Sequence, residues 1–316
     1  MQEAAFCRVE VYARERAKLA QSRVATAGEV VAEIARREGF CDHVDDLVRP
    51  GDKPAPGPRP PVTVWGCDPE TVPEIIEREI AALKARGIRA PRRDTPVLAG
   101  YVVSAPVSPS RFARDPAAAA WTKRLLRASL HHLRRETARR GGRVVSAVVH
   151  RDESRVHMHV LALPSEVPGY TANALHPGRA ARRAAQAAGR DAVDASRAAS
   201  AALSDFVDAY HAQVGRPFGL LRRTAARPRR RLSRAALRRV RAPAAAPRAA
   251  RPAAAGAPPA ASPGRPPDRP WRLADFVAGA DTALARLASG PGRTAARPEP
   301  VPPDPDRPGG PGPRGP

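Results

Sequence analysis

The sequence predicts an α+β domain over residues 1–221, built on an antiparallel sheet of about five strands with helices packed on one face and followed by a disordered basic tail. Three observations favour this class. Short segments with strand periodicity alternate with longer segments of helical periodicity. Two strand-like segments are separated only by RDESR, which is the spacing of a hairpin. Beyond Leu221 the chain is dominated by Arg, Ala and Pro, and offers too little apolar surface to offset the entropy of an ordered chain.

The N-terminal part of the domain supplies two strands and two helices. The predicted strands are Phe6–Tyr12 and Val62–Gly66, and the predicted helices are Thr26–Glu38 and Pro69–Arg86. Apolar and polar residues alternate along the first strand, as in a strand with one buried face. Gly39 is expected to end the first helix, while Asp68 caps the start of the second and Gly87 ends it. A loop rich in Pro and Gly, over residues 50–61, separates the first helix from the second strand.

The rest of the domain supplies three more strands and two helical regions. The predicted strands are Val97–Val107, Val144–His150 and Val156–Pro164. The predicted helices run from Asp115-Pro116 to about Arg140, and from Pro177 to about Val214. Gly141-Gly142 separates the first of these helices from the hairpin. We expect that hairpin at the centre of the sheet.

Positive charge is concentrated in the segment C-terminal to the predicted domain. The net charge of +23 favours a polyanionic partner. Fifteen Arg and one acid, Asp268, lie between Arg216 and Arg269, so this stretch carries +14 of the total. We divide the remainder into a disordered linker (222–270), a short amphipathic helix (271–289) and a disordered Pro/Gly-rich tail (290–316). The candidate DNA-binding residues are Arg222, Arg223, Arg229, Arg230 and Arg231. The alternative interpretation is a solvated tail without a specific role, which would have the same composition.

The chain predicts a cytoplasmic protein that does not insert into a membrane. Its three cysteines, Cys7, Cys41 and Cys67, have no paired spacing, as expected of reduced thiols. The N-terminal segment has alternating charge and no apolar core of an export signal. No window approaches the roughly 18 apolar residues that span a bilayer.

Three histidines fall within ten residues, as His150-x6-His157-x-His159. Side chains alternate along a strand, so His157 and His159 are expected on one face with Met158 buried on the other. The hairpin turns His150 towards the same face. Three protein ligands leave coordination positions open, which a catalytic ion requires. Surface histidines with an incidental ion pair are the alternative interpretation.

Two acids, Asp152 and Glu153, lie in the turn between these histidines. A carboxylate there can accept a hydrogen bond from a ligand histidine and fix its tautomer, or can help to bind the metal.

The segment HRDESRVHMHVLALP resembles the third motif of the MobV (Mob/Pre) family of plasmid relaxases, which reads His-x-Asp-Glu-x-x-Pro-His-x-His. His150, Asp152, Glu153, His157 and His159 match it. The segments VLAGYVVSAPVS and VDAYHAQVGRPFGLLR also look like parts of that catalytic domain, so the resemblance spans roughly residues 5–222. The motif's proline is Val156 here, and the His-Asn pair of the family's first motif is not visible.

The resemblance implies a fold of the HUH relaxase type and a DNA strand transferase that nicks one strand at a plasmid transfer origin. The enzyme would stay joined to the 5′ end, in plasmid mobilisation or recombination. The implied cofactor is Mn²⁺ or Mg²⁺, held by His150, His157 and His159, with Glu153 assisting catalysis. The implied partners are single-stranded and supercoiled plasmid DNA and a coupling or accessory protein. The alternatives are a rolling-circle replication initiator with the same chemistry and a non-catalytic DNA-binding remnant.

The nucleophile is the residue that the sequence determines least. His43 and Tyr12 are the leading candidates, with Tyr170 and Tyr101 behind them. His131 and His132 are interpreted as part of a solvated or DNA-facing basic helix face. His176 is expected to cap a helix or lie on the surface rather than contact DNA.

Overall fold

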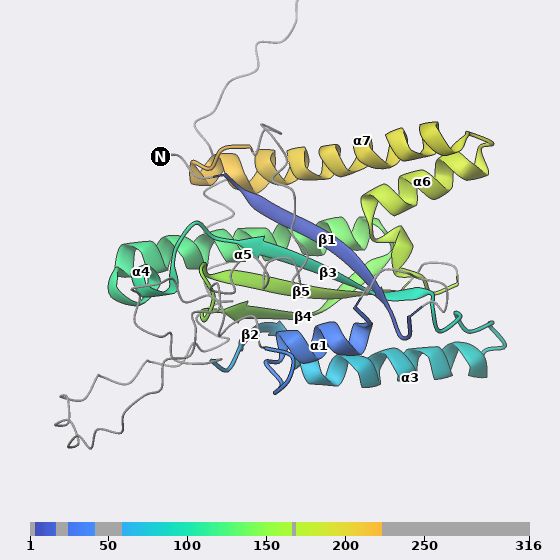
Figure 1. The fold of residues 1–316 in the computed structure, drawn as a ribbon, viewed down its shortest axis with the longest axis horizontal. Coiled ribbons are helices and arrows are strands. Elements are labelled where there is room, and N and C mark those ends of the chain that lie inside the picture. The colour runs from blue at the N-terminus through green and yellow to red at the C-terminus, as the bar shows by residue number, and fades with distance from the viewer. Residues whose placement is uncertain (1–3, 17–24, 42–58, 166–168, 223–316) are drawn as a thin grey trace, which may run out of the picture. The chain divides into compact units, whose positions relative to one another are not determined.

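The structure is a computed structural model that describes residues 4–16, 25–41, 59–165 and 169–222. Its strands are β1 (Phe6–Ala13), β2 (Val62–Gly66), β3 (Pro96–Ser104), β4 (Gly142–His150) and β5 (His157–Pro164). They form one sheet in the order β1-β3-β5-β4-β2, and every pairing between them is antiparallel (Figure 1). The predicted sheet is thereby confirmed. The hairpin is central as expected, because β5 is the middle strand.

The helices begin where the capping residues indicate. They are α1 (Ala27–Ile34), α3 (Val72–Ala85), α4 (Pro109–Arg114), α5 (Pro116–Arg139), α6 (Pro177–Ala187) and α7 (Ala192–Tyr210). Thr26 forms a capping box with Glu29 at the start of α1. Asp68 caps a 3-10 turn, Pro69–Thr71, that leads into α3, and Asp115 caps α5.

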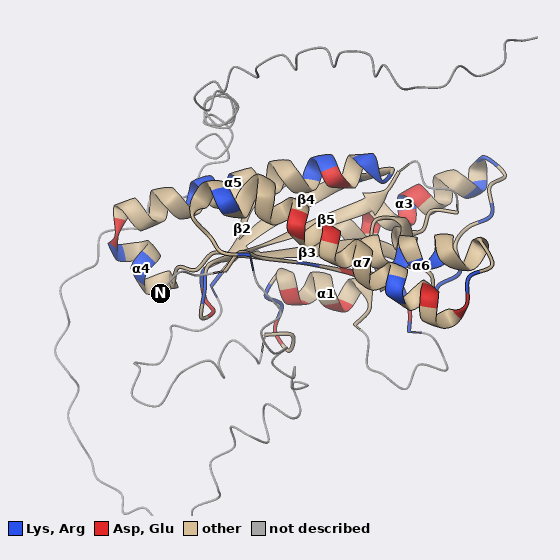
Figure 2. Cartoon of the chain, turned by 90° about the horizontal axis from the view of Figure 1, so that it is seen from above, with Lys and Arg blue, Asp and Glu red and all other residues tan. Residues whose placement is uncertain are grey.

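Helices cover both faces of the sheet, so the prediction that they pack on one face is wrong. Helices α5 and α7 pack on one side, where the buried sheet residues include Val149 and Met158. Helices α1 and α3 pack on the other side, against residues that include Val148 and Leu161. Figure 2 shows α5 and α1 on opposite sides of the sheet. The physical reason is that β4 and β5 are apolar on both faces, and each face requires its own cover.

Several element boundaries differ from the predicted ones. Helix α1 ends at Ile34, and Arg36 then takes a left-handed backbone with φ +60°. Strand β3 ends at Ser104 and is followed by α4, which was not predicted. The single helical region expected after Pro177 is two helices, α6 and α7, which are separated at Gly189 with φ +73°.

The last described residues close onto the first strand. The carbonyl of Leu221 accepts a 2.9 Å hydrogen bond from the backbone amide of Ala5. The predicted linker beyond Arg222, the helix at 271–289 and the tail at 290–316 lie outside the described residues. Among the helices that the structure describes, none has the length and apolar content needed to cross a membrane. No disulfide joins the three cysteines.

Candidate metal centre

The central hairpin brings the three histidines together as expected. His150 of β4 pairs directly with His157 of β5, and His159 lies two residues further along the same strand. The ring centroids are 5.0 Å apart for His150–His157, 4.8 Å for His150–His159 and 5.0 Å for His157–His159. One ligand atom from each ring lies within 4.8 Å of the other two. Met158 is buried on the opposite face, also as predicted.

The ring nitrogen of His150 that could bind a metal is Nδ1. The Nε2 atom of His150 is 2.8 Å from the backbone carbonyl of Ile34 at the end of α1, and must therefore be the protonated donor. Nδ1 is buried and has no hydrogen-bond partner among the described residues. A buried nitrogen lone pair without a partner is costly, and a bound cation would satisfy it.

His157 is also held by a backbone carbonyl, but through Nδ1 rather than Nε2. Its Nδ1 atom donates to the backbone carbonyl of Arg155 at 3.0 Å, which leaves Nε2 as the ligand atom. That Nε2 atom lies 3.5 Å from Oε1 of Glu153. The tautomers of both residues are thus set by groups outside the cluster, as in many metal sites.

Two of the histidines are held neutral, which metal binding requires. Burial, aided by the charges of Arg36 and His157, lowers the pKa of His150 to about 3. Burial, together with the neighbouring His150 and His157, also holds the pKa of His159 well below its ordinary value. The donor set and its protonation states therefore fit a divalent cation. Imidazole nitrogens favour a transition metal over Mg²⁺, which prefers oxygen ligands.

Arg36 was missed by the sequence reasoning, although it organises the turn of the hairpin. Its Nη2 and Nε atoms bind the two carboxylate oxygens of Asp152 at 2.8 and 2.9 Å. Nη2 also binds Oε1 of Glu153 at 2.7 Å. The side chains of Arg36 and Asp152 are only 3% and 1% exposed. No sequence signal marks this contact, because 116 residues separate the two partners.

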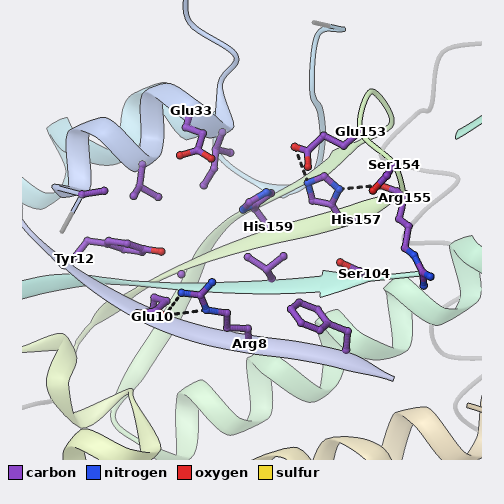
Figure 3. A pocket seen from close by; sticks show the side chains of 16 residues that line it. Arg8, Glu10, Tyr12, Glu33, Ser104, Glu153, Ser154, Arg155, His157 and His159 are labelled. Atoms are coloured by element: carbon purple, nitrogen blue, oxygen red, sulfur yellow. Dashed lines mark hydrogen bonds and ion pairs between the residues drawn. The ribbon is translucent and has the colours of Figure 1, made fainter. Parts of the chain in front are cut away.

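A pocket of about 550 Å³ opens beside the histidines, between α1 and the sheet (Figure 3). It is lined by His157, His159 and Glu153, by alternate residues of β1 and β3, and by α1. Figure 3 shows the Tyr12 hydroxyl and the Glu33 carboxylate directed into the pocket. Tyr12 lies over Gly100, where an added Cβ would come within 2.9 Å of the Tyr12 ring. Glycine at this position therefore makes room for the ring.

Among the nucleophile candidates that the structure describes, Tyr12 is the one that lines this pocket. Tyr101 faces the other side of the sheet, where its hydroxyl lies near Thr137 and the carbonyl of Leu175. Tyr170 lies under α3, and its hydroxyl donates to Glu79 at 2.7 Å. His43 lies outside the described residues.

His176 and His132 have structural roles away from the cluster. His176 caps α6 by accepting from the backbone amide of Arg179 at 3.2 Å, which confirms the capping interpretation. His132 is buried, with Nδ1 3.1 Å from Oε1 of Gln213 and its ring against Tyr210. The expectation of a solvated or DNA-facing side chain is therefore wrong for His132, because α5 turns this side towards α7.

The predicted DNA-binding arginines fall at the edge of the described residues. Arg222 forms an ion pair with Asp208 of α7 and also donates to Ser204. Arg223, Arg229, Arg230 and Arg231 lie outside the described residues. The comparisons with protein-family models, curated proteins and solved structures found no match to this chain.

Proposed function

We propose that the protein is a metal-dependent DNA strand transferase that nicks one strand and stays joined to the 5′ end. One observation carries the proposal: three histidines with ligand atoms within 4.8 Å of one another lie beside a pocket that also holds Tyr12. The setting in plasmid mobilisation or recombination, with a transfer origin as substrate, rests on the resemblance of residues 150–159 to the MobV motif.

The metal would be held by Nδ1 of His150, Nε2 of His157 and a ring nitrogen of His159. Of the two cations that the resemblance implies, this set of nitrogen donors favours Mn²⁺ over Mg²⁺. When bound, the ion supplies positive charge that polarises a phosphate oxygen and offsets charge developing in the transition state. Glu153 would contribute negative charge beside the ion, since its Oε1 atom lies 3.5 Å from Nε2 of His157.

Tyr12 is our proposed nucleophile. Its hydroxyl oxygen attacks the phosphorus of the scissile phosphate and forms a phosphodiester with the 5′ end, while the bond to the 3′ oxygen breaks. The phenol proton passes to the Glu33 carboxylate, which is directed into the same pocket (Figure 3). The departing 3′ oxygen takes up a proton from water. Because one phosphodiester replaces another, the exchange is reversible and lets the enzyme rejoin the strand.

The proposal is tested by capture of the covalent product. The full chain is incubated with Mn²⁺ and a library of random-sequence single-stranded DNA, and adducts that survive denaturation are sequenced and mapped by mass spectrometry. We expect an adduct at Tyr12, which survives acid as a phosphotyrosine and is lost in Tyr12→Phe. An acid-labile adduct lost in His43→Ala would reassign the nucleophile to His43. A protein that binds Mn²⁺ and DNA but forms no adduct would be a non-catalytic remnant.

A further inference from the structure

The turn of the hairpin holds a second set of metal donors beside the three histidines. His150, Asp152 and Glu153 also place one ligand atom each within 4.8 Å of the others. The two sets share His150, and Oε1 of Glu153 is 3.5 Å from the Nε2 atom through which His157 would bind a metal. A cation in this region can therefore be bound by nitrogen alone or by nitrogen and oxygen together.

Arg36 occupies the oxygen donors of the second set. One guanidinium binds both oxygens of Asp152, at 2.8 and 2.9 Å, and Oε1 of Glu153 at 2.7 Å. Oδ2 of Asp152 also accepts from the backbone amide of Arg59 at 3.2 Å. Since Arg36 and Asp152 are almost fully buried, water competes little for these charge-assisted bonds.

The ion pairs of Arg36 with Asp152 and Glu153 determine the local charge and the donor atoms that are available to a metal. Arg36 offsets one of the two negative charges that Asp152 and Glu153 carry. Without Arg36, Asp152 would lose both of its guanidinium hydrogen bonds and Glu153 would lose its ion pair with the same group. Carboxylate oxygens are the preferred ligands of Mg²⁺ and Ca²⁺, whereas imidazoles favour transition metals.

We propose that Arg36 determines the metal specificity of this centre, because its ion pairs with Asp152 and Glu153 compete with the ion for those carboxylates and leave the three imidazoles as its main ligands. This inference rests on the proposed function only in assuming that the centre binds a metal. The remaining coordination positions then stay open to a phosphate oxygen rather than being filled by carboxylates. Arg36 is in this sense a positioning residue, because it acts through the two acids.

The test compares cation affinities in the full chain without DNA. Dissociation constants for Mn²⁺ are measured by electron paramagnetic resonance, and those for Mg²⁺ and Ca²⁺ by competition, in the wild type and Arg36→Gly. Glycine suits the left-handed backbone at this position, with φ +60°, so the change removes the side chain without straining the turn. We expect the preference for Mn²⁺ over Mg²⁺ to fall by about tenfold or more in Arg36→Gly, comparable to other changes around metal ligands.

A triple variant, Arg36→Gly with Asp152→Asn and Glu153→Gln, is the matched control. It keeps the shapes of both side chains but removes their charge, and we expect the wild-type ratio of the Mn²⁺ and Mg²⁺ affinities to return even though the loss of the Glu153 charge weakens both. Should Arg36→Gly fail to fold, Arg36→Gly with Asp152→Asn avoids a buried Asp152 charge without its guanidinium and still removes the ion pair of Arg36 with Glu153. An unchanged cation preference in a folded variant would overturn the proposed role of Arg36 but not the metal centre. Failure of the wild type to bind Mn²⁺ would overturn the metal centre itself, and this inference with it.

Discussion

The Nε2 atom of His150 donates a 2.8 Å hydrogen bond to the backbone carbonyl of Ile34. This contact joins the central hairpin to the end of α1 and leaves Nδ1 of His150 as its buried ring nitrogen without a hydrogen-bond partner among the described residues. It also places α1 so that Glu33, one residue earlier, is directed into the pocket (Figure 3). One backbone carbonyl thus links the proposed metal site to the wall of the proposed substrate pocket.

Replacing any one of the three histidines by Ala is expected to abolish Mn²⁺ binding and DNA nicking. Two imidazoles hold a divalent ion much more weakly than three. The loss of the ion also removes positive charge from the phosphate site. Glu153→Ala is expected to be partial, with affinity reduced about 10- to 100-fold. Calorimetric Mn²⁺ titration and a nicking assay on the same preparations provide the measurements. Full nicking activity in His157→Ala would contradict the assignment.

Gly100→Ala is expected to reduce adduct formation about a hundredfold while the protein stays folded. The new Cβ would lie 2.9 Å from the Tyr12 ring, which must move, and a displacement of about 1 Å can reduce a rate by that factor. Gly28→Ala is the matched control, because nothing lies within 4 Å of its added Cβ. Single-turnover adduct yield measures both variants. Equal yields would show that the position of Tyr12 is not critical.

The stability of the metal-free protein is expected to fall as the pH decreases below about 6.5, the ordinary histidine pKa. The folded state holds the pKa of His150 at about 3 and that of His159 well below its ordinary value, so the unfolded chain binds more protons in this range. For each histidine that stays neutral in the folded state, the free energy of unfolding then falls by up to about 1.4 kcal/mol for each unit by which the pH decreases. Urea unfolding between pH 6.5 and 5 measures the slope.

The matched variant for this measurement is His150→Gln with His159→Gln, which keeps polar side chains that do not titrate. Its free energy of unfolding should depend less steeply on pH than that of the wild type. The same slope in both proteins would mean that these two histidines are protonated in the folded state.

Truncation after Arg222 is expected to leave a folded domain that still nicks DNA. The cut preserves the Leu221–Ala5 hydrogen bond and the Arg222–Asp208 ion pair, which hold the last described residues to β1 and α7. DNA affinity should fall and its salt dependence flatten, by about 0.7–0.9 in log–log slope for each phosphate that the shortened protein no longer neutralises. Fluorescence anisotropy at several salt concentrations measures this slope. An unchanged slope would show that the segment beyond Arg222 does not touch DNA.

The histidine cluster was predictable because it depends on local geometry alone. Alternation along a strand places His157 and His159 on one face, and a short turn returns His150 to them. The strands and most helix starts were predictable for the same reason, since Thr26, Asp68 and Asp115 carry capping signals within a few residues of the helices they begin.

The features that escaped prediction depend on contacts between distant parts of the chain. Arg36 meets Asp152 only because α1 lies against the central hairpin, and its left-handed backbone carries no signal in an arginine. Tyr12 shares a pocket with His159 only because β3 alone separates β1 from β5 in the sheet, which alternation along one strand cannot reveal. The second layer of helices likewise follows from packing against both apolar faces.

Metal-dependent strand cleavage is best measured on DNA that contains the sequence recovered by adduct capture. Negatively supercoiled plasmid is incubated with the wild type, with His157→Ala and with chelated wild type, and the nicked strand is examined for covalent protein. We predict Mn²⁺-dependent open circles with protein on the 5′ end for the wild type, and none for the other two. Nicking that persists in His157→Ala or without a divalent metal would contradict the proposed function.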